Sequence, residues 1–326
     1  MIVWGGGACK ANPCRGDSVE PLADGAAYDP ASDAWRPLAR SPLAARTRTV
    51  DVWTGREMLV WGGQAGTRVF SDGAAYDPAA DTWRPLAPAP LSPRRTTGVW
   101  TGRELVMWGG GNDAPDFMAD GAAYDPAADR WRTIAPSPLS ARDMRGAIEW
   151  TGREMVVWGG GTSDQAFDDG AAYDPVADRW RTIAPSPLAG RFARSSWTGT
   201  QLLLWGGEDY RQVFDDGAAY DPAADRWRLL ARSPLRARQG AVQAWTGTEL
   251  LVWGGTVGTY DNYFGDGAAY DLAADRWRPI PTWSGRLASG LWTGRELLVW
   301  GGTVPSERTG RDSPIESTAE GRRYRP

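Results

Sequence analysis

Hydrophobic and polar positions form short segments along the whole chain, and the same segments return about every fifty residues. Each copy opens with a partly alternating segment that ends in Trp-Thr-Gly, as at residues 49–55. A continuous apolar segment closed by two glycines follows, as at residues 57–63. Partial alternation predicts a strand with one exposed face, and the apolar run predicts a strand buried on both faces. The Thr-Gly pair suits the tight turn between them.

Two further segments complete each copy after a loop of variable sequence. The first reads Asp-Gly-Ala-Ala-Tyr-Asp-Pro, as at residues 72–78, and its small residues suit close packing of neighbouring sheets. Proline then ends the strand. The second is short and carries a tryptophan, as at residues 129–132. Each copy therefore predicts four short strands.

The repeat itself predicts the fold. A period of about fifty residues with four strands per copy is typical of a β-propeller, in which each copy forms one antiparallel blade. We expect an all-β, seven-bladed propeller of four-stranded blades, with six blades as the alternative, forming one domain over residues 1–326. The expected blades are approximately 1–39, 40–87, 88–135, 136–184, 185–231, 232–280 and 281–326. The Trp-Gly-Gly motifs that mark the period begin at Trp4, Trp61, Trp108, Trp158, Trp205, Trp253 and Trp300.

The ends of the sequence fall inside the repeat. Met1 aligns with Met58, within the second strand, and Tyr324 aligns with Tyr76, in the third strand. The first and last blades are therefore expected to be incomplete. One segment equivalent to residues 79–104 would fill both gaps, which favours an N-terminally truncated sequence. A completed ring is expected to be monomeric.

Composition narrows the chemistry. The chain has no histidine and a net charge of −4, and its apolar segments are too short to span a membrane. The absence of histidine removes the commonest general base and metal ligand. The charge argues against a nucleic-acid partner. Position in the repeat accounts for all of the 20 tryptophans except Trp283, so we interpret them as architectural.

A di-glycine after an apolar strand, then Tyr-Asp-Pro, then tryptophan about five residues later resembles the kelch repeat. The whole chain is similar to bacterial kelch-like proteins of the galactose oxidase central-domain superfamily. The resemblance implies four-stranded blades whose first strand lines a central channel. It does not imply the copper site of galactose oxidase, because that site needs histidines; no cofactor is expected. The matching tyrosines are Tyr28, Tyr76, Tyr124, Tyr173, Tyr220 and Tyr270.

One candidate site is a set of arginines that recur in the connections between blades. A ring of guanidinium groups could bind an anionic ligand. The structural alternative, which we favour, is pairing with the recurring aspartates of the Asp-Gly motif on the same face. The arginines are Arg46, Arg94, Arg142, Arg191, Arg238 and Arg286.

A second candidate lies in the loops of blades five and six, where the side chains do not recur. Asp209, Tyr210, Tyr260, Asn262 and Tyr263 combine aromatic rings with amide and carboxylate groups, which suits carbohydrate binding. The loop phenylalanines recur in register, so we assign them to packing.

Cys9 and Cys14 lie in the long loop of the first repeat. We expect a small disulfide, and with it a secreted, periplasmic or cell-surface protein. Two unpaired thiols are the alternative.

The function that this sequence favours is a non-catalytic binding or interaction scaffold. Its variable loops on one face would bind a protein or a carbohydrate. The alternative is a sugar-active hydrolase, lyase or epimerase that uses carboxylate and tyrosine groups. The sequence marks no catalytic, cofactor-binding or metal-binding residue.

Overall fold

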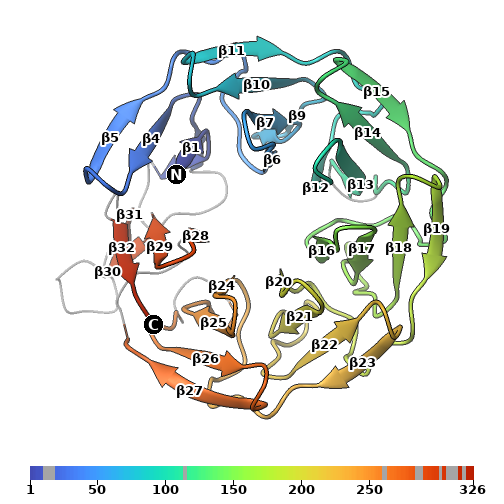
Figure 1. Cartoon of the computed structure of the whole chain (residues 1–326), viewed down its shortest axis with the longest axis vertical. Coiled ribbons are helices and arrows are strands. Elements are labelled where there is room, and N and C mark those ends of the chain that lie inside the picture. The colour runs from blue at the N-terminus through green and yellow to red at the C-terminus, as the bar shows by residue number, and fades with distance from the viewer. Residues whose placement is uncertain are drawn as a thin grey trace. The chain divides into compact units, whose positions relative to one another are not determined.

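The computed structural model describes residues 1–9, 19–112, 116–258, 263–282, 289–300, 303–305, 315–317 and 321–326. The regular elements in these ranges are all β-strands (Figure 1). No helix within them is long and apolar enough to cross a membrane.

Five four-stranded antiparallel sheets repeat one design, in which the strands lie side by side in chain order. The first is formed by β6 (Val50–Trp53), β7 (Met58–Trp61), β10 (Gly73–Asp77) and β11 (Thr82–Pro85). The second has β12 (Arg95–Trp100), β13 (Leu105–Gly111), β14 (Gly121–Asp125) and β15 (Arg130–Thr133). The third has β16 (Ala147–Trp150), β17 (Met155–Trp158), β18 (Gly170–Asp174) and β19 (Arg179–Thr182). The fourth has β20 (Ser195–Trp197), β21 (Leu202–Trp205), β22 (Gly217–Asp221) and β23 (Arg226–Leu229). The fifth has β24 (Val242–Trp245), β25 (Glu249–Trp253), β26 (Gly267–Asp271) and β27 (Arg276–Ile280).

Two three-stranded sheets belong to the ends of the chain. One contains β1 (Ile2–Trp4), β4 (Gly25–Asp29) and β5 (Ala34–Pro37), and the other contains β28 (Ser289–Trp292), β29 (Leu297–Trp300) and β32 (Gly321–Tyr324). The predicted all-β propeller with four-stranded antiparallel blades is confirmed. The expected seven blades are not confirmed, because the two sheets at the ends of the chain have only three strands each, and the structure matches the six-bladed alternative.

Three small hairpins lie in the variable loops that follow second strands. They are β2 (Gly7–Cys9) with β3 (Val19–Pro21), β8 (Gln64–Ala65) with β9 (Arg68–Val69), and β30 (Thr303–Pro305) with β31 (Ile315–Ser317). Short pairing of this kind shapes a loop without lengthening the blade.

The chain divides into two compact units. The first unit comprises Met1–Met144 with Tyr173–Trp180, and the second comprises Arg145–Ala172 with Arg181–Pro326. The single domain expected over residues 1–326 stays a prediction.

The core lies between neighbouring blades of each unit. The apolar residues in the second strands of the five complete sheets are buried, as the apolar runs predict: Leu59, Val60 and Trp61 are at most 1% exposed. The indoles of five second-strand tryptophans lie against the fourth-strand tryptophan of the next blade. Trp61–Trp131 and Trp158–Trp227 are examples, with ring centroids 6.0 and 5.7 Å apart. First-strand tryptophans are less buried, and Trp53 is 50% exposed.

Candidate functional site

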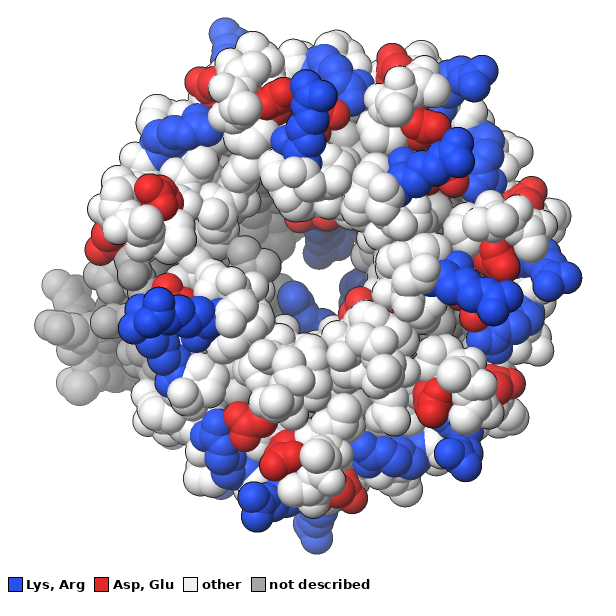
Figure 2. Space-filling model, in the orientation of Figure 1, with Lys and Arg blue, Asp and Glu red and all other residues white. Residues whose placement is uncertain are grey.

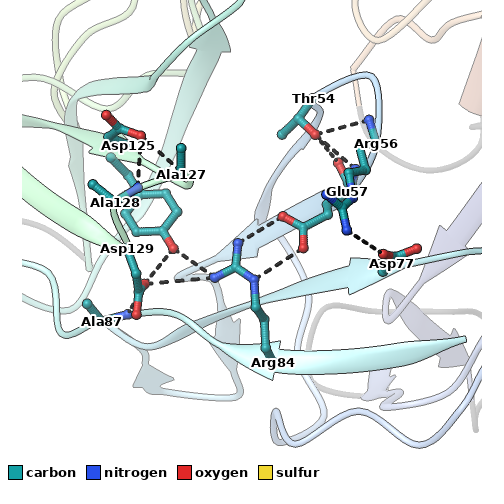
Figure 3. A network of polar contacts seen from close by, with 11 residues as sticks. Thr54, Arg56, Glu57, Asp77, Arg84, Ala87, Asp125, Ala127, Ala128 and Asp129 are labelled. Atoms are coloured by element: carbon teal, nitrogen blue, oxygen red, sulfur yellow. Dashed lines mark hydrogen bonds and ion pairs between the residues drawn. The ribbon is translucent and has the colours of Figure 1, made fainter. Parts of the chain in front are cut away.

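A polar network that recurs between blades explains most of the charged residues near the fourth strands (Figure 3). The Arg84 guanidinium donates to both carboxylate oxygens of Glu57, at 3.2 and 2.8 Å, and to the Tyr124 hydroxyl of the next blade at 3.1 Å. Tyr124 in turn donates to Asp129 at 2.6 Å. Burial, with Asp129 as acceptor, raises the pKa of Tyr124 to about 12. The tyrosine therefore stays protonated and acts as a structural donor.

Sequence reasoning missed this network, although all of its residues recur. The same contacts join Arg132 to Glu104 and Tyr173, and Arg181 to Glu154 and Tyr220. Among the described residues on the face drawn in Figure 2, positive and negative charges lie next to one another, and no large patch of one sign forms.

One blade departs from the network. Gln201 occupies the position of Glu57, and its side-chain carbonyl oxygen is buried with no hydrogen-bond partner among the described residues. Arg228 still donates to Tyr270 at 3.1 Å. Arg228 therefore lacks the bidentate contact that Arg84 makes with Glu57.

The arginines of the candidate ring are buried. Arg46, Arg94, Arg142, Arg191 and Arg238 are at most 1% exposed. Four of them form ion pairs with the aspartate of a following Asp-Gly motif, at Nη1–Oδ1 distances of 2.5–2.7 Å. The Arg238 guanidinium holds the pKa of Asp266 below its usual range. Arg142 donates from Nε to the Ser140 carbonyl.

Loop phenylalanines lie against three of these arginines, Arg46, Arg191 and Arg238. The Arg46 guanidinium carbon lies 3.8 Å from the ring centre of Phe70, and Arg191 lies 3.7 Å from that of Phe214. A cation packed against an aromatic ring and paired with a carboxylate serves the fold. The guanidinium groups themselves are enclosed, whereas the aspartate side chains paired with four of them are 44–57% exposed.

The non-recurring side chains meet in a different place, which we call the Tyr210 cluster: Arg145, Thr162, Phe192, Glu208 and Tyr210, all in the second unit. The Tyr210 hydroxyl donates to the Thr162 carbonyl at 2.6 Å and accepts from Arg145 at 2.8 Å. Its ring meets that of Phe192 edge-on, with centroids 5.0 Å apart. Arg145 lies over Phe192 at 4.3 Å and pairs with Glu208 at 3.7 Å. Loops from two blades and both preceding connections therefore converge on one tyrosine.

The backbone of Tyr210 is unusual. Its φ is +72°, and no other aromatic residue in the described ranges has a positive φ. The loop of the blade that begins with β6 also has six residues between Gly-Gly and phenylalanine, and its third residue is Gly66, with a φ of +59°. Gly258 holds the third position in the following blade's loop, with a φ of +68°. The positive φ at this position favours glycine, and Tyr210 adopts the same backbone conformation although a bulky side chain disfavours it.

A second non-recurring group is Glu149, on the first strand β16. It accepts a hydrogen bond of 2.9 Å from the Ser195 hydroxyl on the neighbouring first strand β20. Other copies carry Val52, Val99 or Ala244 at this position. Burial raises the pKa of Glu149 to about 7, although Ser195 acts in the opposite direction.

Some of the remaining candidate residues make local contacts, and the others lie outside the described residues. Asp209 Oδ1 accepts from the backbone of Arg211 and Gln212, which closes the turn at Tyr210. Tyr263 pairs through its backbone with Thr256. Tyr260, Asn262, Arg286 and Cys14 lie outside the described residues, so the disulfide with Cys9 stays a prediction.

Comparison with known proteins does not assign this chain to a family. No protein-family model matches the chain, and no curated protein matches it. Within the described ranges, no group of three or more histidine, cysteine, aspartate or glutamate side chains could hold a metal ion. The function must therefore be argued from the Tyr210 cluster and Glu149.

Proposed function

We propose that this protein is a non-catalytic binding scaffold, and that the Tyr210 cluster is the contact surface for its partner. The recurring charged and aromatic residues serve the blades and their contacts. What remains is a small set of side chains that occur in one copy only, on loops held by a rigid framework. Loops of this kind are where binding sites concentrate.

The observation that carries the proposal is the conformation of Tyr210. Holding a non-glycine residue in a sparsely populated backbone region costs about 1–3 kcal/mol. Two other copies place glycine at this step, so the tyrosine is not needed to form the turn. The residue is still 45% exposed, so burial offsets only part of the strain. Strain retained at an exposed aromatic side chain is typical of a functional residue.

We also propose that the propeller is of the kelch type. The di-glycine turns, the tyrosine that bonds across blades and the fourth-strand tryptophan support a kelch-type propeller. We retain six blades, the alternative to the seven that the seven Trp-Gly-Gly second strands suggest. A secreted location would suit a scaffold that binds an external partner.

A loop exchange tests the function. Residues 208–213 are replaced by Gln-Ala-Gly-Thr-Arg-Val, the six residues of the loop that contains Gly66. This loop has the same length and supplies the glycine, so we expect an unchanged circular dichroism spectrum. The exchanged and native proteins are then compared by glycan array and by pull-down. A partner that binds both proteins equally would place the contact surface elsewhere.

Glu149 supports one alternative, a sugar-active enzyme. A carboxyl with a pKa of about 7 is suited to general acid catalysis, and Glu149 is such a group. Its test is release of nitrophenol from a panel of nitrophenyl glycosides. Turnover by the native protein that disappears in Glu149→Gln would favour the enzyme over the scaffold.

A further inference from the structure

We propose that the Tyr210 cluster binds a neutral hexopyranose, with the C–H face of the sugar on the exposed part of the Tyr210 ring. This inference rests on the proposed function and adds the class of ligand. Three features of the cluster carry it: a fixed aromatic ring, a balanced set of polar groups, and little apolar surface around them.

The ring is fixed before any ligand arrives. Hydrogen bonds to Thr162 and from Arg145 hold the hydroxyl, and Phe192 supports the ring edge-on. Tyr210 as a whole remains 45% exposed, although the Arg145 guanidinium lies 5.7 Å from the centre of its ring. A pre-positioned aromatic surface loses little conformational entropy on binding, which matters most for a small ligand. Amphipathic aromatic side chains of this kind offer an apolar face beside a polar edge.

The polar groups around the ring favour a neutral ligand. The Arg145 side chain is 47% exposed, and its charge is matched by Glu208 at 3.7 Å. Asp209 and Arg211, which flank Tyr210 on the same turn, carry opposite charges. Guanidinium donors and carboxylate acceptors can both bond hydroxyl groups. A sulfated or acidic sugar would instead need an excess of positive charge, which these residues do not provide.

The surroundings argue against a protein partner. Protein interfaces have a buried apolar centre with several large anchors. In the described part of the second unit, the exposed large hydrophobic residues are Tyr210 and Leu229. Leu229 ends β23, the fourth strand of its blade, whereas Tyr210 lies in the loop between the second and third strands. One aromatic ring among hydroxyl-binding groups fits a sugar better than a protein surface.

The experiment is a glycan array followed by titration calorimetry with the methyl glycoside of the best-bound neutral hexose. Three variants are compared with the native protein: Tyr210→Gly, Tyr210→Phe and, as a control away from the loop, Leu229→Ala. We expect Tyr210→Gly to weaken binding about tenfold or more, because it removes the ring. Tyr210→Phe keeps the ring and should stay within about threefold, and Leu229→Ala should have no effect.

Several outcomes would overturn the ligand class. These are no neutral hexose bound, binding confined to sulfated or acidic glycans, or equal affinity in Tyr210→Gly. A photo-crosslinker placed at residue 211 separates this failure from failure of the scaffold. If residue 211 crosslinks to a protein, and the loop exchange abolishes that crosslink, the sugar would be refuted as the ligand and the proposed binding scaffold would stand. Neither glycan binding nor loop-dependent crosslinking would reject both.

Discussion

Single residues in this chain can be judged against their own counterparts, because each copy of the repeat acts as a control for the others. Glu57, Glu104 and Glu154 each receive two hydrogen bonds from a fourth-strand arginine. Gln201 stands at the same position without them. A side chain that departs from its counterparts either lacks a stabilising contact or forms a structural contact of its own, and the two cases predict opposite effects on stability when the common residue is restored.

Restoring the common residue at position 201 should stabilise the protein. Gln201→Glu would place a carboxylate beside Arg228 and satisfy the oxygen that is now unpaired. We expect a gain of about 1 kcal/mol, because the contact is charge-assisted but partly exposed. Chemical denaturation measures it. The matched variant Glu154→Gln should lose a similar amount, and a loss in both variants would show that Gln201 has a role of its own.

The sequence predicts some of the contacts between residues and misses others. Pairing of the buried arginines with Asp-Gly could be anticipated, because every copy contains both partners. The contact of Arg84 with Tyr124 was missed, since it joins residues forty positions apart through the packing of one blade on the next. The strain at Tyr210 was missed as well, although aligning its loop with the one that contains Gly66 would have suggested it.

Within the elements, stability comes mainly from second strands enclosed between neighbouring blades. Trp158 shows this arrangement at the end of β17. Its side chain is fully buried, it packs on Trp227, and its indole N–H donates to the Asp168 carbonyl at 2.9 Å. The fold therefore depends on each second strand being apolar on both faces.

Truncating this tryptophan should be costly. Trp158→Ala is expected to lower the free energy of unfolding by about 3–5 kcal/mol, the range for a deleted core aromatic. Urea denaturation followed by circular dichroism measures the change. Trp53→Ala is the matched control, because Trp53 is 50% exposed, and it should lose less than about 1.5 kcal/mol. Equal losses would contradict this view of the blade core.

The burial of Glu149 on the first strand β16 should make stability depend on pH. The pKa of Glu149 is about 7 in the folded protein, against an ordinary value of 4.5. The folded state therefore favours the neutral carboxyl, and its contribution is full below about pH 4.5. Stability should fall as the pH rises from about 4.5 to 7, by roughly 2–3 kcal/mol.

Denaturation of the native protein and Glu149→Gln across this pH window measures the effect. The chain has no histidine, so no group with an ordinary pKa near 6.5 adds to it. The difference between the two proteins should grow with pH and level off above about pH 7. Parallel stability curves would show that Glu149 ionises as readily in the folded state as in the unfolded chain.

For the whole molecule, the repeat was enough to predict an all-β propeller of four-stranded blades, but it did not give the number of blades or the contacts of the site. Four strands per copy, their order and the buried second strand all follow from a pattern that recurs. The Tyr210 cluster joins Arg145 to Tyr210, 65 positions apart, through loops that differ from copy to copy. Such contacts depend on how neighbouring blades pack, which the repeat pattern alone does not specify.

The central claim is that the recurring residues build the blades, whereas Tyr210 is retained for binding at some expense to the fold. The stability of Tyr210→Gly tests it most directly. Glycine removes strain worth about 1–3 kcal/mol but loses two hydrogen bonds worth about 1 kcal/mol each. In urea denaturation we therefore predict a free energy of unfolding within about 1 kcal/mol of the native value. A loss of more than about 2 kcal/mol would contradict the account, because it would make Tyr210 a structural residue like the others.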